Sequence, residues 1–286
     1  MSELRVVIGV SLKMYFGAQE TLAWCRSVAN IARRHPAVTT GVAEIFVLPG
    51  APVISQTIEV FADTPVNVGG QNLFWEDRGA FTGEVNGAML HELGCRYVEV
   101  GHAERRRLFG EDDVVVAAKT AAALRNGLIP VLCIGEPDRT SVAAASTRCI
   151  AEVAAALTVA ARDHCLGPIV VAYEPQWAIG ASEPAAPEYI GGVCRAIVHW
   201  LAANNALEGS RVIYGGSAGP GLLPRLGDSV GGLFLGRFAH DPRAFEAILD
   251  DVLAVRHNSV QRGPQAQSSI EADPFSVERS PSWPLA

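Results

Sequence analysis

One glutamate, Glu174, directly follows the apolar run that ends at Tyr173, and a proline comes after it. His102 and Lys13 stand at or just beyond the ends of two other apolar runs, and Glu104 lies two residues beyond the histidine. A carboxylate can take a proton from carbon, while an imidazole and an ammonium group can stabilise the negative charge that then develops on oxygen. These residue types predict proton abstraction next to a carbonyl group, if the fold brings them together.

Glycine-rich segments follow two later apolar runs. The first reads YGGS and ends at Ser217, and the second reads GLFLG and ends with Leu235 and Gly236. Glycine lets the backbone approach a ligand closely, and backbone amides can bind a phosphate group. The pattern therefore predicts a small phosphorylated compound as the substrate.

Each of these residues alone has a simpler interpretation. A lysine after a strand is usually solvated, a histidine at a strand end often caps a helix or fills a core, and Glu174 could simply pair with an arginine. Glycine-rich turns are also common. The chemical interpretation is favoured because all these residues follow apolar runs that recur along the chain.

Eight short apolar runs alternate with helical segments. They occupy residues 5–10, 45–49, 65–70, 97–101, 128–135, 168–174, 211–216 and 232–236. Strands that are apolar throughout are buried on both faces, and helical connections between them imply parallel crossovers. Eight such units in about 250 residues predict an α/β fold with one domain, a (β/α)8 TIM barrel, in which functional groups lie at the carboxyl ends of the strands.

Alanine-rich segments with apolar spacing at residues 21–34, 114–127 and 148–164 predict helices packed against this sheet. From residue 255 onward serine, proline and glutamine dominate the sequence. We therefore expect a barrel domain over residues 1–254 and a disordered tail over 255–286.

The composition restricts the partners. A formal net charge of −7 argues against nucleic acid and anionic membranes. The six cysteines form no CxxC pair, which favours reduced thiols in a cytoplasmic protein. The N-terminus lacks the pattern of an export signal, and we find no apolar run of about 18 residues. The histidines lack metal-ligand spacing and no dinucleotide fingerprint follows the first strand, so we expect neither metal nor cofactor.

In order along the chain, seven motifs resemble the triosephosphate isomerase family over residues 5–254. They are SLKMY (11–15), GGQN (69–72), GAFTGE (79–84), GHAERR (101–106), CIGE (133–136), AYEPQWAIG (172–180) and YGGS (214–217). The resemblance implies that Glu174 is the base, that His102 is a neutral electrophile and that Lys13 is a fixed positive charge. Glu104 resembles a supporting residue near the lysine.

The same resemblance implies a lid over the site. Its hinged segment runs from Pro175 to Gly180, with Trp177 and Ile179 as the apolar closure. A lid would keep water away from the reactive enediolate. The amide of Gly180 would reach the phosphate group of the substrate.

Further residues are implied at the phosphate end and at a subunit contact. Backbone amides of Ser217, Leu235 and Gly236 would bind the phosphate dianion. Thr82 resembles a residue that reaches into the site of a neighbouring subunit, so the resemblance implies a homodimer.

Departures from the family pattern bear on the substrate. Ser11 stands where the glycolytic enzymes have asparagine, Ala103 replaces a serine, and Leu235 with Gly236 replaces a pair of glycines. Ser11, the segment NLFWEDRGAFTGE (72–84) and GLFLGR (232–237) together resemble the branch that isomerises tetrulose phosphates in tetritol breakdown, from L-erythrulose 1-phosphate to D-erythrulose 4-phosphate. The shorter Ser11 would leave room for the additional hydroxymethyl group of this substrate.

Three alternatives remain open from the sequence. The chain could be a glycolytic triosephosphate isomerase with drifted motifs, since small changes near a site often leave specificity intact. It could be a sugar-phosphate-binding barrel that has lost turnover, although the joint presence of Lys13, His102 and Glu174 argues against this. A lyase or synthase on a phosphate-binding barrel would be expected to place its lysine and acids elsewhere.

Overall fold

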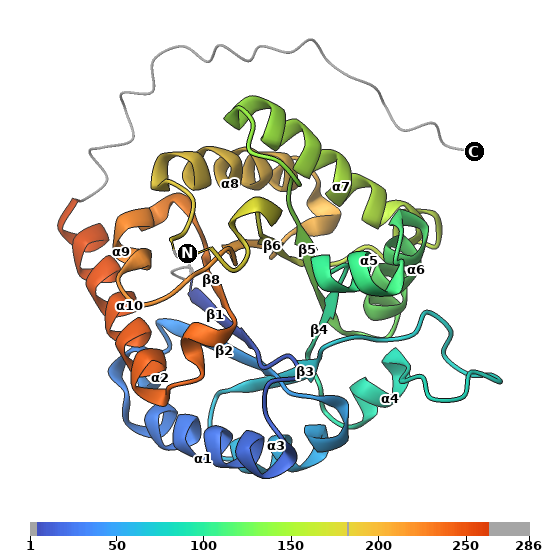
Figure 1. The fold of residues 1–286 in the computed structure, drawn as a ribbon, viewed down its shortest axis with the longest axis horizontal. Coiled ribbons are helices and arrows are strands. Elements are labelled where there is room, and N and C mark those ends of the chain that lie inside the picture. Colours follow the sequence, from blue (N-terminus) through green and yellow to red (C-terminus); the bar gives the residue numbers. More distant parts are fainter. Residues whose placement is uncertain (1–4, 182, 263–286) are drawn as a thin grey trace.

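A computed structural model describes residues 5–181 and 183–262, whose strands form a closed parallel barrel in chain order (Figure 1). The first strand pairs with both the second and the eighth, which closes the barrel. The strands are β1 (Val6–Ser11), β2 (Ala43–Leu48), β3 (Asn67–Gly70), β4 (Tyr97–Val100), β5 (Ile129–Ile134), β6 (Val170–Tyr173), β7 (Arg211–Tyr214) and β8 (Gly232–Leu235). All eight predicted strands and the predicted fold class are confirmed.

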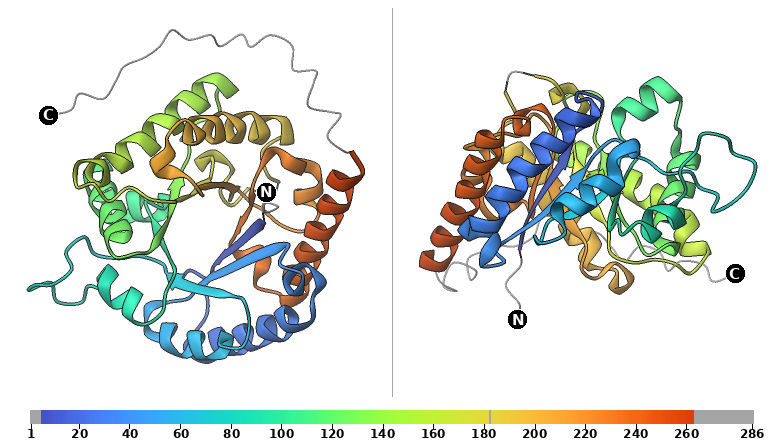
Figure 2. Two further views of the ribbon diagram at one scale, coloured as in Figure 1. Left: turned by 180° about the vertical axis from the view of Figure 1, so that it is seen from behind. Right: turned by 90° about the horizontal axis from the view of Figure 1, so that it is seen from below.

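The helices form a ring outside the strands (Figures 1 and 2). They are α1 (Ala18–Arg34), α2 (Pro36–Thr39), α3 (Ile54–Phe61), α4 (Gly87–Glu92), α5 (Ala103–Phe109), α6 (Asp113–Arg125), α7 (Val142–Arg162), α8 (Pro187–Ala202), α9 (Leu222–Leu226) and α10 (Pro242–Arg262). Short 3-10 turns lie at Ala51–Val53, Gln176–Ala178, Asn205–Leu207, Gly227–Ser229 and Arg237–Ala239. The helices predicted over 21–34, 114–127 and 148–164 correspond to α1, α6 and α7.

The starts of several helices are set by capping side chains. At the start of α6, the Asp112 side chain accepts a hydrogen bond from the backbone amide of Val115. At the start of α7, the Ser141 side chain accepts one from the backbone amide of Ala144. Such caps satisfy backbone amides that have no partner within the helix. Pro187 occupies the first position of α8, where a missing amide hydrogen is tolerated.

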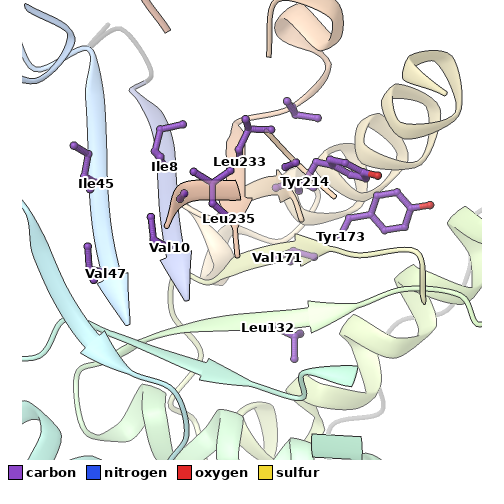
Figure 3. Close-up of a cluster of buried hydrophobic side chains, with 14 of the residues drawn as sticks. Ile8, Val10, Ile45, Val47, Leu132, Val171, Tyr173, Tyr214, Leu233 and Leu235 are labelled. Atoms are coloured by element: carbon purple, nitrogen blue, oxygen red, sulfur yellow. The ribbon is translucent and has the colours of Figure 1, made fainter. Parts of the chain in front are cut away.

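The strands separate two apolar layers. Their outward side chains, among them Ile8, Val47 and Leu132 (Figure 3), form one cluster with buried side chains of the helices. Their inward side chains fill the barrel with a second cluster that includes Phe46. Gly9 is required on this inner face, because a Cβ atom there would lie 2.2 Å from the Phe46 ring. The interior below the site is therefore a packed core and not an open channel.

The predicted end of the domain needs correction. Helix α10 continues to Arg262, and Val255 is only 8% exposed, so residues 255–262 belong to the barrel domain and not to a tail. The change in composition begins within the last turns of this helix, whereas the first helix-breaking pair of residues after its start is Gly263-Pro264. The remainder of the expected tail, 263–286, lies outside the described residues.

By length and composition alone, α7 could cross a membrane, and it is the one helix of which this holds in the described part of the chain. In the barrel it packs against α6 and α8 and contributes buried side chains to the outer layer. A core helix of a barrel has the same composition, so α7 alone does not indicate a membrane span.

Candidate active site

The carboxyl ends of the strands surround a cavity of about 520 Å3, which brings together most of the predicted site residues. The cavity is lined by Ser11, Lys13, His102, Glu104, Glu174, Ile179, Gly180, Ser217, Leu235 and Gly236, among others. Pro175, Trp177 and Thr82 do not line it. A single polar cavity with a base, an imidazole and an ammonium group on its wall fits the predicted chemistry.

Glu174 follows β6 and is held in a tight space at the edge of the cavity. Its side chain is only 8% exposed, and its Oε2 lies 3.5 Å from Nε2 of His102. A Cβ atom on Gly215 would lie 2.4 Å from Oε1 of Glu174, so only glycine leaves room for this orientation. Gly215 of the YGGS motif thus makes space for the carboxylate, in addition to any role at the phosphate.

His102 caps the start of α5, and this contact fixes its tautomer. Its Nδ1 accepts a hydrogen bond of 3.1 Å from the backbone amide of Glu104. A nitrogen that accepts a hydrogen bond carries no proton, so the proton of the neutral imidazole lies on Nε2, the atom that faces Glu174. His102 can therefore donate a hydrogen bond to a substrate oxygen without being charged.

Lys13 is held in an unusual backbone conformation. Its φ of 50° lies in the left-handed region, which non-glycine residues rarely adopt. The turn is fixed by Gln71, whose Nε2 donates to the carbonyl oxygens of Lys13 and Leu48 at 3.0 and 2.9 Å. Such strain persists where the surroundings determine the conformation, and it is common at functional sites.

The ammonium group of Lys13 donates a hydrogen bond of 2.8 Å to Oε1 of Glu104. Burial lowers the pKa of Lys13, but the bond to Glu104 and the negative charges of Glu174 and Glu104 outweigh it, so the pKa lies above its usual value. Lys13 is therefore a permanent positive charge at neutral pH. For the acid Glu104, burial acts in the opposite direction and raises the pKa. The hydrogen bond to Lys13 and the charge of Lys13 outweigh this effect, so the pKa of Glu104 lies below its usual value.

Three glycine-rich turns meet at the other end of the cavity. Gly180 has a φ of 75° and Ser217 a φ of 52°, so both backbones turn in the left-handed region. No atom lies within 4 Å of the position that a Cβ atom would occupy on Gly236, which leaves its backbone accessible to a ligand. Leu235 is buried at the end of β8. This arrangement can present several amides to one anion.

The expected lid is tied to the barrel at both ends. The Trp177 indole donates a hydrogen bond of 2.9 Å to Oε1 of Glu136, and the Ser217 hydroxyl bonds to the carbonyl oxygens of Ala178 and Ala181 at 2.9 and 3.0 Å. Trp177 thus anchors the lid, whereas Ile179 lines the cavity. The sequence predicted a role for the backbone amide of Ser217 at the phosphate, but it did not reveal the bonds of the Ser217 hydroxyl group to the lid.

A second cavity of about 500 Å3 adjoins Glu174 on the side of α5 and α7. Its wall includes Ala103 and two arginines, Arg106 and Arg148. Glu174 lines the same cavity, and Ala103 has no hydroxyl group with which to form a hydrogen bond to it.

Thr82 lies on the long segment between β3 and α4, which projects away from the barrel (Figures 1 and 2). Its side chain is exposed, and aromatic contacts of Phe74 with Trp75 and Phe81 stiffen the segment around it. An exposed projecting segment suits contact with another chain.

Glu99 is a site residue that the sequence analysis missed. It lies on the inward face of β4, is 4% exposed and accepts a hydrogen bond of 2.9 Å from the Ser11 hydroxyl. Burial raises its pKa, and the charge of Glu174 adds to this, although His102 opposes it. A charged residue type inside the apolar run YVEV was the signal that could have revealed it.

Within residues 5–181 and 183–262, no group of three or more histidines, cysteines or acidic residues is placed so that it could hold a metal ion. All six cysteines are free, and five of them are buried. Burial raises the pKa of Cys25 and Cys95 to about 11, which disfavours reactive thiolates.

Comparisons with known proteins place these features in a family. The family model described as triosephosphate isomerase matches residues 6–252. The chain is 56% identical to L-erythrulose-1-phosphate isomerase of Pectobacterium atrosepticum, over 89% of this chain and 98% of that protein. It is 37% identical to triosephosphate isomerase of Moorella thermoacetica, over 86% and 98% of the two chains. The crystal structure of triosephosphate isomerase from Bartonella henselae aligns with a TM-score of 0.71 at 26% identity, over 86% and 98%.

Proposed function

Because this chain belongs to the triosephosphate isomerase family, we propose that it is an isomerase that converts L-erythrulose 1-phosphate to D-erythrulose 4-phosphate without a cofactor. The observation that carries the reaction is the position of the Glu174 carboxylate, 3.5 Å from the protonated Nε2 of a neutral His102 at the wall of one cavity. The choice of substrate is supported by the 56% identity to a relative named for it.

The reaction moves one proton between two carbons and one between two oxygens. Glu174 takes the proton from C3 of the substrate, and the electron pair forms the C2–C3 double bond of an enediolate. His102 donates a hydrogen bond to the developing oxyanion, and Lys13 stabilises its charge. Glu174 then returns a proton to C2 and the hydroxyl proton passes from the C3 oxygen to the C2 oxygen, which leaves the carbonyl group at C3 and completes the isomerisation with no net gain or loss of atoms.

The rest of the cavity would hold the phosphate group and exclude water. We assign the phosphate to the amides of Gly180, Ser217, Leu235 and Gly236. Ile179 would cover the reacting carbons while the enediolate exists, and the anchored lid would limit hydrolysis and loss of the intermediate.

A second candidate function is the isomerisation of dihydroxyacetone phosphate. It is supported by 37% identity to a triosephosphate isomerase that this chain matches over most of its length. The two substrates differ in one hydroxymethyl group at the reacting carbon, so the same catalytic residues would act on either. Only the shape and polarity of the wall near that carbon can discriminate between them.

Side-by-side kinetics on the two ketose phosphates test this proposal. We expect a higher kcat/KM for L-erythrulose 1-phosphate than for dihydroxyacetone phosphate, with the Glu174→Gln variant as the blank. A preference for the triose would make the second candidate the correct one. Turnover of neither compound by the purified protein would favour a barrel that only binds sugar phosphates.

We also propose that the protein works in the cytoplasm as a homodimer. The homodimer is supported by the exposed projecting segment around Thr82, and the cytoplasmic location by the family and by the free thiols of all six cysteines. Sedimentation equilibrium measures the assembly directly, and the mass of a single chain in solution would contradict the dimer.

A further inference from the structure

Glu99 is a buried acid that the proposed mechanism leaves without a role. It lies on the inward face of β4 next to the catalytic residues, with Oε1 3.9 Å from both Nε2 of His102 and Sγ of Cys133. A buried carboxyl group is unfavourable unless it is hydrogen-bonded. Within the described residues, the short hydrogen bond to this carboxyl group comes from the hydroxyl group of Ser11, 2.9 Å from Oε2.

The hydrogen bond fixes how Ser11 faces the cavity. The Ser11 hydroxyl group donates its one hydrogen to Glu99. Its oxygen can therefore act only as a hydrogen-bond acceptor, through its lone pairs, toward other groups. Ser11 lines the 520 Å3 cavity, whereas Glu99 lies behind it, outside the lining. Ser11 therefore presents a fixed acceptor, and not a freely rotating hydroxyl, to whatever occupies the cavity.

The acceptor stands at the reacting end of the site. Glu99 is close to His102, and Nε2 of His102 is the atom assigned to the reacting oxygens of the substrate. L-erythrulose 1-phosphate has at this end a C4 hydroxyl group, a hydrogen-bond donor that dihydroxyacetone phosphate lacks. The Ser11 oxygen, as an acceptor, can take a hydrogen bond from this hydroxyl group.

We propose that Glu99 is a positioning residue for substrate choice, which orients the Ser11 hydroxyl to accept a hydrogen bond from the C4 hydroxyl of the four-carbon ketose phosphate. This inference rests on the proposed function. A direct action of Glu99 on His102 is less well supported, because 3.9 Å exceeds the length of a hydrogen bond. Sites that bond a substrate hydroxyl discriminate strongly against an analogue without it.

Substitution of Glu99 tests the proposal through a ratio of two rates. The quantity is kcat/KM for L-erythrulose 1-phosphate divided by kcat/KM for dihydroxyacetone phosphate. We expect Glu99→Met, which has a similar length but cannot accept the Ser11 proton, to lower this ratio about tenfold or more. Glu99→Gln retains an acceptor oxygen and should restore the ratio to within about threefold of the wild-type value.

A control variant separates this role from the loss of a hydrogen-bonded, partly buried acid elsewhere in the barrel. Glu44 lies on β2 and accepts a hydrogen bond of 2.6 Å from the Tyr97 hydroxyl, away from the cavity lining. Glu44→Met should leave the ratio unchanged. If Glu99→Met folds poorly, Ser11→Ala removes the same acceptor with a smaller change, and it should lower the ratio by a similar factor.

The outcomes distinguish this inference from the proposed function. A wild-type protein that prefers the triose would refute the proposed function before any variant is measured, and with it this inference. If the wild type prefers the tetrulose but Glu99→Met and Ser11→Ala leave the ratio unchanged, only the role of Glu99 is refuted. An equal fall for both substrates would show that Glu99 is merely structural.

Discussion

Turnover should fall by roughly 10²- to 10⁴-fold when Glu174 is replaced by glutamine. The carboxamide is nearly the same size as the carboxylate, so the tight space beside Gly215 is preserved. The carboxamide cannot accept a proton from carbon, so the substitution removes the base and leaves His102 and Lys13 in place. Steady-state kinetics with the preferred ketose phosphate measure the effect, and we expect the loss in kcat and not in KM.

A second, partly buried acid provides the control for this substitution. Glu152 lines the adjoining cavity and accepts a hydrogen bond of 3.2 Å from the backbone amide of Gly135. Burial raises its pKa. Glu152→Gln should keep kcat within about threefold of the wild-type value, because Glu152 has no assigned role in the reaction. Near-normal turnover by Glu174→Gln would refute the assignment of the base.

Lys13→Met should lower kcat/KM by about 10²- to 10³-fold. Methionine has a similar length but no charge, so the enediolate loses its fixed positive partner and Glu104 loses its ion pair. Because Lys13 also approaches the bound substrate in its ground state, we expect KM to rise as well as kcat to fall. Measurement on the preferred substrate, with the folded state checked by circular dichroism, gives both quantities.

Substitution by arginine distinguishes loss of charge from loss of shape at this position. Lys13→Arg retains the positive charge but places it on a larger planar group, so part of the lost activity should return. If the methionine variant keeps the wild-type kcat/KM, the charge of Lys13 is not used in the reaction. If arginine gives no recovery beyond methionine, the position of the ammonium group matters more than its charge.

The barrel was predictable because its signals are local and repeated. Each strand is a short apolar run, such as the one that ends at Ile134, and each is buried on both faces by its neighbours and by the helices. The rule that functional groups lie at the carboxyl ends of strands then predicts that Lys13, His102 and Glu174 lie on one rim.

The features that the sequence did not reveal depend on contacts between distant residues. The hydrogen bond between Ser11 and Glu99 joins residues that are 88 positions apart in the chain, on different strands. A charged residue within an apolar run marks Glu99, but the sequence does not predict that Ser11 is its partner. The second contact of Ser217 is of the same kind, because it depends on where the lid lies. The end of α10 was misplaced for another reason, since polar composition alone does not end a helix whose inner face, at Val255, is still buried.

The central claim is that this protein moves a proton within a four-carbon ketose phosphate. Its most direct test is nuclear magnetic resonance of the product formed from L-erythrulose 1-phosphate in deuterated water by the wild-type protein. We predict D-erythrulose 4-phosphate with deuterium on the carbon that was C2 of the substrate, beside the phosphorylated methylene group. No conversion of the tetrulose, or a product labelled at another carbon instead, would contradict the account.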